Sequence, residues 1–100
     1  MLVALGGKDK KNAVMLEAHI DTLGAMVAEI KSNGRLRVTP VGGMNANNAE
    51  AENCRIHTRF GEKVYEGTLQ LANASIHVNG GYNDKKRTFD ETEIVLDEKV

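Results

Sequence analysis

The sequence contains no apolar stripe at helical spacing that is longer than about two turns. Short runs of alternating apolar and polar residues are instead interrupted by Gly, Asn and Asp. Alternation with a period of two is typical of strands that bury one face, and Gly and Asn clusters mark the turns between strands. The pattern predicts a mostly β fold. Its core must rely on Val, Ile, Leu, Ala and Met, because only 4% of the residues are aromatic.

The pair Asn33-Gly34 predicts a β-hairpin within residues 25–41. A two-residue loop would place the apolar stripes of the two strands on opposite faces of the sheet, which is a poor use of a buried face. A three-residue loop with Gly34 in the left-handed conformation aligns the stripes, and this register is the one expected. It pairs Ile30 with Leu36, Glu29 with Arg37 and Ala28 with Val38.

Other strands are expected at residues 2–5, 14–18, 54–60, 64–69, 72–78 and 92–96. The segment 14–18 is almost continuously apolar, as in a strand that is covered on both faces within a mixed or parallel sheet. Asn47 and Glu50 have the spacing of an N-cap and its partner in a helix of at most about two turns. No helical segment is long enough to cover such a sheet, so the chain is expected to be a fragment of a larger protein.

The charges are balanced, with 13 basic and 14 acidic residues and a formal net charge of −1. This balance argues against a nucleic-acid or anionic-membrane partner that is held by bulk electrostatics. The one cysteine cannot form an internal disulfide and matches no cysteine-based zinc spacing, which favours a reducing, cytoplasmic setting. Neither a membrane anchor nor a secretion signal is expected from the pattern.

His19 and Asp21 form the one constellation with chemical content. They follow the predicted strand 14–18, and loops after buried strands commonly carry metal and ligand groups. A neutral imidazole can bind zinc, while a carboxylate two residues on can hold the other ring nitrogen and fix the orientation of the ring. The alternative is a hydrogen-bonded surface or core histidine, and the pair alone does not decide between the two.

A wider set of residues resembles the glutamyl aminopeptidase and tetrahedral aminopeptidase family of dinuclear metallo-aminopeptidases. The most specific part is VMLEAHIDTLG at residues 14–24, followed by NGRL at 33–36 and PVGG at 40–43. The resemblance continues through residues 55–59, 67–68, 76–78 and 93–98. It implies that residues 1–44 are an incomplete part of an α/β catalytic domain. Residues 45–100 would then belong to an inserted, β-barrel-like dimerisation domain that is incomplete at its C-terminal end.

The resemblance also implies the chemistry. His19 matches a metal ligand, and Asp21 matches the catalytic-site carboxylate that orients it. The full-length protein would hold two divalent metal ions, zinc or cobalt, and a metal-activated water would remove N-terminal residues from peptides. It would be a cytoplasmic homo-oligomer built from dimers, up to a dodecamer. The fragment alone would bind no metal and be inactive, since catalytic zinc usually needs three protein ligands.

Other candidates are weaker. His57 and His77 could be ligands, but His57 alternates with Arg55 and Arg59 on one strand face, and the resemblance described above implies that the later ligand histidine lies further along the sequence. Arg55, His57 and Arg59 could instead form an anion-binding stripe, but a solvated strand face is the better interpretation because Glu50, Glu52, Glu62 and Glu66 lie nearby. Cys54 lacks a base at a recognisable spacing and is expected to be a buried small hydrophobe. No acidic pair indicates a glycan hydrolase. The rival hypothesis is a non-catalytic β-rich oligomerisation module, in which His19 would bind no metal.

Overall fold

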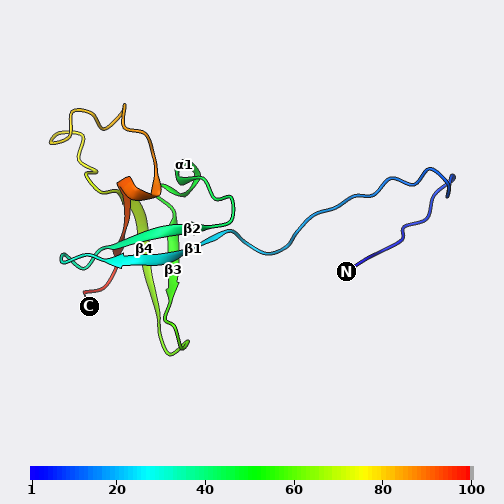
Figure 1. Ribbon diagram of the computed structural model, residues 1–100, viewed down its shortest axis with the longest axis horizontal. Coiled ribbons are helices and arrows are strands. Elements are labelled where there is room, and N and C mark those ends of the chain that lie inside the picture. Colours follow the sequence, from blue (N-terminus) through cyan, green and yellow to red (C-terminus); the bar gives the residue numbers. More distant parts are fainter. Residues whose placement is uncertain (100) are drawn as a thin grey trace.

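A computed structural model describes residues 1–99. Its centre is one antiparallel sheet of five strands in the order β1-β2-β5-β4-β3, which curls into an open half-barrel (Figure 1). The prediction of a mostly β chain is confirmed. The strands are β1 (Gly24–Ile30), β2 (Leu36–Val41), β3 (Asn53–His57), β4 (Val64–Leu71) and β5 (Thr92–Leu96), with a short helix α1 (Ala46–Ala49) and a 3-10 turn η1 (Phe89–Glu91).

The β1–β2 hairpin has the three-residue loop expected from the sequence. Ile30 faces Leu36 and Glu29 faces Arg37, and Gly34 has a φ of 82°. The third expected pair is wrong: a bulge between Val27 and Glu29 places Val27, rather than Ala28, opposite Val38. A bulge adds one residue to one strand and increases the local twist. Period-two alternation alone gives no signal for that extra residue.

The core lies on one face of the curled sheet. Leu36 and Val38 from β2, Leu69 from β4 and Ile94 from β5 form a buried cluster, and none of the four exposes more than 6% of its surface. Each such side chain contributes about 1.5–3 kcal/mol when it is removed from water. The core therefore joins the hairpin to the strands that follow it in the sequence. Partly buried residues pack around this cluster: Ala49, Cys54, Ile56, Phe89 and Leu96.

Residues 1–23 lie outside the sheet as an extended segment that projects away from it (Figure 1). The strands expected at residues 2–5 and 14–18 are not formed here. Val14 and Leu16 are exposed at 86% and 89%. A strand requires a neighbour for its backbone hydrogen bonds, and no segment within residues 1–99 pairs with this one.

The strand expected at residues 72–78 is also wrong, because this segment forms turns. The backbone N–H of Asn79 donates to the carbonyl of Ser75 at 2.7 Å, a local bond that replaces cross-strand pairing. Asn and Gly favour such turns over strands. The strand expected at 54–60 ends at His57, and Phe60 is left 78% exposed beside the turn at Gly61.

Helix α1 has a single turn, which is within the limit of about two turns expected from the sequence, but its N-cap is two residues earlier than expected. Asn45, not Asn47, is the N-cap, and its side chain accepts from the backbone N–H of Asn47 at 3.0 Å. Glu50 ends the helix and instead accepts from Nε of Arg87 at 2.8 Å. Because Asn is a favoured N-cap residue, several of the neighbouring asparagines were suitable caps, and the sequence alone did not distinguish among them.

The sheet contains strands from both sides of residue 44, since β2 pairs with β5 through Leu36 and Ile94. The domain boundary between residues 1–44 and 45–100 therefore stays a prediction. No helix within residues 1–99 has the length and apolar character that crossing a bilayer requires.

A buried ion cluster also holds the hairpin against β5. The Glu93 side chain is only 3% exposed, accepts from Nζ of Lys31 at 2.8 Å and accepts from Nη1 of Arg35 as well. Burial raises the pKa of the Glu93 carboxyl, but the hydrogen bonds and positive charges of Lys31 and Arg35 outweigh burial, so its pKa lies below the ordinary value. Both cations remain partly exposed, which reduces the desolvation cost of the cluster.

Gly67→Ala should destabilise the sheet by about 1–3 kcal/mol, the usual cost of overpacking. A Cβ at Gly67 would lie 2.6 Å from the carbonyl oxygen of Val95 and 2.9 Å from Cγ2 of Ile94. Gly43→Ala is the matched control, because nothing lies within 4 Å of its Cβ position. Urea unfolding of the three proteins measures the effect. Equal stabilities for the two variants would contradict the close approach of β4 and β5.

Glu93→Gln should lower the free energy of unfolding at neutral pH by about 1.5–3 kcal/mol, the range for hydrogen bonds to charged groups. Because the pKa of Glu93 is lowered by folding, its contribution is present above the unfolded value of about 4.3 and is lost as the pH falls through the folded value. The difference between wild type and variant should therefore shrink in acid. Glu66→Gln is the control, since its pair with Arg55 is 3.7 Å long and exposed. A difference that persists unchanged at low pH would exclude the charged form as its source.

Candidate functional site

His19 and Asp21 lie on the extended segment just before β1, and both side chains are exposed, at 72% and 86%. The ring Nδ1 of His19 is 3.2 Å from Oδ1 of Asp21 and 2.9 Å from the carbonyl oxygen of the same residue. The structure therefore brings the two predicted site residues into contact. When Nδ1 carries the proton, it donates to Asp21 and the lone pair of Nε2 points away from the contact.

This arrangement fits one metal ligand with its orienting carboxylate. In metal sites a ligating histidine usually donates its other ring N–H to a carboxylate or backbone carbonyl, and Asp21 offers both groups. Residues 1–99 contain no group of three or more His, Cys, Asp or Glu side chains that could hold a metal ion. Within residues 1–99 His19 is thus not part of a complete ligand set, and its assignment as a ligand stays a prediction.

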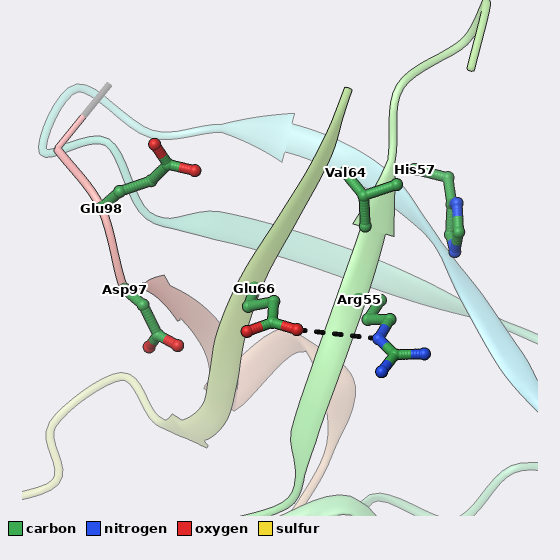
Figure 2. Close-up of a pocket in the computed structure, with 6 residues that line it drawn as sticks. All are labelled: Arg55, His57, Val64, Glu66, Asp97 and Glu98. Carbon is green, nitrogen blue, oxygen red and sulfur yellow. Dashed lines mark ion pairs between the residues drawn. The ribbon is translucent and has the colours of Figure 1, made fainter. Parts of the chain in front are cut away.

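A second cluster of polar residues lines a small pocket between the β3–β4 hairpin and the residues after β5 (Figure 2). Nε of Arg55 is 3.7 Å from Oε1 of Glu66, and both side chains are well exposed. Asp97 and Glu98 line the other side, while the His57 ring lies away from them in Figure 2. The guanidinium of Arg55 faces a carboxylate, which favours the interpretation of β3 as a solvated strand face over an anion-binding stripe.

The larger hollow is a groove of about 1450 Å³ that follows the concave face of the sheet. Its walls come from both edge strands, with Met26 and Val27 on β1 and Cys54 and Ile56 on β3. The segment before β1 reaches it through Thr22 and Leu23. Sequence reasoning missed this groove, because the alternation of each strand predicts an inner face but not how strongly the sheet curls.

Cys54 is half-buried, and its Sγ lies 3.4 Å from the carbonyl oxygen of Gly67, to which the thiol donates. Burial raises the pKa of the Cys54 thiol, and the negative charge of Asp97 raises it further. A raised pKa keeps the thiol protonated and unreactive at neutral pH. This environment agrees with the expected role as a small packed side chain rather than a nucleophile.

The thiol of Cys54 should therefore react slowly with iodoacetamide in the folded protein, and its rate should rise only at alkaline pH. Unfolding in urea removes the burial and separates Cys54 from Asp97, so the midpoint of the pH–rate profile should move down toward about 8.5, the value of a free thiol. Mass spectrometry of the alkylated protein measures both profiles. Identical midpoints with and without urea would contradict the raised pKa.

The fold and the exposed His–Asp pair define an antiparallel β unit that carries one candidate metal ligand at the entrance to its hairpin. The family model of the M42 glutamyl aminopeptidases matches residues 1–100. The chain belongs to this family.

Three relatives have aminopeptidase names. The protein named "Putative aminopeptidase YhfE" of Bacillus subtilis (strain 168) is 43% identical over 100 residues, which is all of this chain and 29% of the relative. The glutamyl aminopeptidase of Lactococcus lactis subsp. cremoris (strain MG1363) is 39% identical over 51 residues, 51% of this chain and 14% of the relative. The lysyl aminopeptidase of Pyrococcus furiosus is 42% identical over 50 residues, 50% of this chain and 14% of the relative. The chain thus spans less than a third of the length of these relatives.

Proposed function

We propose that this chain is part of a metal-dependent aminopeptidase and supplies His19 as one of the metal ligands of its active site. Membership of the M42 family and the aminopeptidase names of three relatives support the reaction class. The observation that carries the metal assignment is the contact between Nδ1 of His19 and Asp21, which leaves Nε2 for a metal.

In this proposal His19 holds the metal and Asp21 positions the ring. A divalent ion such as zinc or cobalt would polarise the substrate carbonyl and activate a water. The Asp21 carboxylate fixes the tautomer of His19 and raises the basicity of its ring. The remaining ligands and the general base would come from sequence beyond this chain, so the chain of 100 residues alone is expected to be inactive.

The substrates proposed are peptides with a free N-terminus. One relative is named for glutamyl and another for lysyl residues, which carry opposite charges, so the preferred first residue does not follow from family membership. For the whole protein we also propose a cytoplasmic location and assembly into homo-oligomers built from dimers. Met26 and Ile30 on the edge strand β1, exposed at 63% and 74%, offer apolar surface for such contacts.

In the full-length protein, His19→Ala should lower the bound metal and reduce the hydrolysis of chromogenic aminoacyl anilides by at least about a hundredfold. The reason is the loss of a direct ligand, whereas Asp21→Asn, which changes only the orienting group, should cost about 10–100-fold in metal affinity or activity. Metal analysis and rates with glutamyl and lysyl substrates, before and after a chelator, provide the measurements.

His77→Ala is the matched control, because His77 is also exposed and belongs to no candidate metal group in the described part of the chain. It should leave metal content and rate unchanged. If His19→Ala also leaves both unchanged, His19 is not a ligand and the non-catalytic oligomerisation module becomes the better hypothesis.

A further inference from the structure

Two loops contain asparagine followed directly by glycine, at Asn33-Gly34 and Asn79-Gly80. This dipeptide is the sequence most prone to deamidation. The backbone nitrogen of the glycine attacks the side-chain amide carbon of the asparagine, and glycine has no side chain to obstruct the attack. On sequence alone, the two sites should react equally. The folded chain makes them different.

The asparagine side-chain carbonyl that is attacked accepts a similar hydrogen bond in each of the two loops. Oδ1 of Asn33 accepts from the backbone N–H of Arg35 at 3.0 Å. Oδ1 of Asn79 accepts from the backbone N–H of Gly81 at 3.2 Å. Both bonds run from the asparagine side chain to the residue two positions on, as in a typical Asx turn. They polarise the two side-chain carbonyls alike, so this contact does not distinguish the two asparagines, and the attacking nitrogens are compared next.

The attacking nitrogens differ. The N–H of Gly34 donates to the carbonyl of Lys31 at 2.9 Å, inside a loop that the paired strands β1 and β2 hold closed. The N–H of Gly80 makes no hydrogen bond within residues 1–99, and Gly80 is exposed. Attack requires this nitrogen to lose its proton to water or hydroxide. A bonded N–H must first be released, whereas Gly80 is exposed and its N–H has no such bond to break.

The structure around the two asparagines adds to the expected difference between their deamidation rates. Asn79 lies among the turns of residues 72–88, which contribute no strand to the sheet, as the loop at the edge of Figure 1 shows. Local bonds such as the one from the N–H of Tyr82 to the carbonyl of Asn79, at 3.1 Å, close these turns. Segments with few buried contacts open locally at low cost, while a hairpin within a sheet opens rarely. Rearrangement toward the cyclic intermediate is therefore easier at Asn79.

We propose that Asn79 is a site of spontaneous deamidation in the folded protein and that the hairpin protects Asn33. The Gly80 nitrogen bonds to Cγ of Asn79, the bond from Cγ to Nδ2 breaks, and Nδ2 leaves as ammonia with the proton that Gly80 loses. The product is a cyclic imide. Water then opens the ring at Cγ to give aspartate, or at the main-chain carbonyl to give isoaspartate, and no oxidant or reductant takes part.

The modification would change the loop itself. Nδ2 of Asn79 donates to the carbonyl of Asn73 at 3.0 Å, and both products lose this donor. Each product carries a carboxylate, so the formal net charge goes from −1 to −2. Isoaspartate also routes the main chain through the former side chain, which breaks the turn from Asn79 to Tyr82.

The test is incubation of the purified protein at mildly alkaline pH, in buffer and in concentrated urea, followed by digestion at acidic pH and peptide mass spectrometry. Deamidation adds about 1 Da to the peptide concerned. In buffer, the Asn79 peptide should convert several-fold faster than the Asn33 peptide. In urea, which removes the folded hairpin, the two rates should become similar.

Two variants sharpen the test. Gly80→Ala adds a side chain at the attacking position and should slow conversion of Asn79 several-fold without changing the rate at Asn33. Gly34→Ala is unsuitable as its counterpart because Gly34 has a positive φ, so Asn33→Gln serves to confirm the peptide assignment. The proposal is overturned if Asn33 converts as fast as Asn79 in the folded protein, or if the same ratio persists in urea.

Discussion

The docking of the β1–β2 hairpin onto β5 is the interaction on which the rest of the structure depends. The hairpin is joined to the remaining strands through one edge of β2, where Leu36 pairs with Ile94. Two different forces act at this junction. Apolar burial of Leu36 and Val38 against β4 and β5 works on one face of the sheet. At β5, the side chains of Lys31 and Arg35 from the hairpin form ion pairs with the carboxylate of Glu93, which is almost completely buried. Apolar burial is not directional, so the ion cluster contributes the geometric specificity.

The features that are local in sequence could be predicted. The hairpin loop with its left-handed Gly34 follows from Asn-Gly between alternating strands, and β4 and β5 follow from alternation alone. The ion cluster could not be foreseen, because Lys31 and Glu93 are far apart along the chain and nothing in the hairpin loop or in β5 indicates that they meet. The bulge at Val27 and the exact cap of α1 were missed because neighbouring residues were equally suitable.

The candidate site likewise combines features that could be predicted from the sequence with features that could not. Side chains two residues apart lie on the same side of an extended chain, so the contact between His19 and Asp21 could be predicted from the sequence. The apolar pattern of residues 14–18 predicted a strand, yet this segment is exposed. A sequence pattern indicates that a segment favours the strand conformation, but it does not show whether a neighbouring strand is present to pair with it. Family membership, rather than the geometry of one imidazole, is the main support for the proposed aminopeptidase function.

The short connection between Asp21 and β1 limits where a catalytic centre can be. Three Cα steps separate Asp21 from Gly24, the first residue of β1, and an extended chain advances at most about 3.6 Å per residue. However the segment before it rearranges, the His19 backbone must stay within about 18 Å of the start of β1. Thr22 and Leu23, which make this connection, also line the concave groove. The backbone of His19 is thus tethered by only a few residues to the segment that lines this groove, whatever conformation the chain before it adopts.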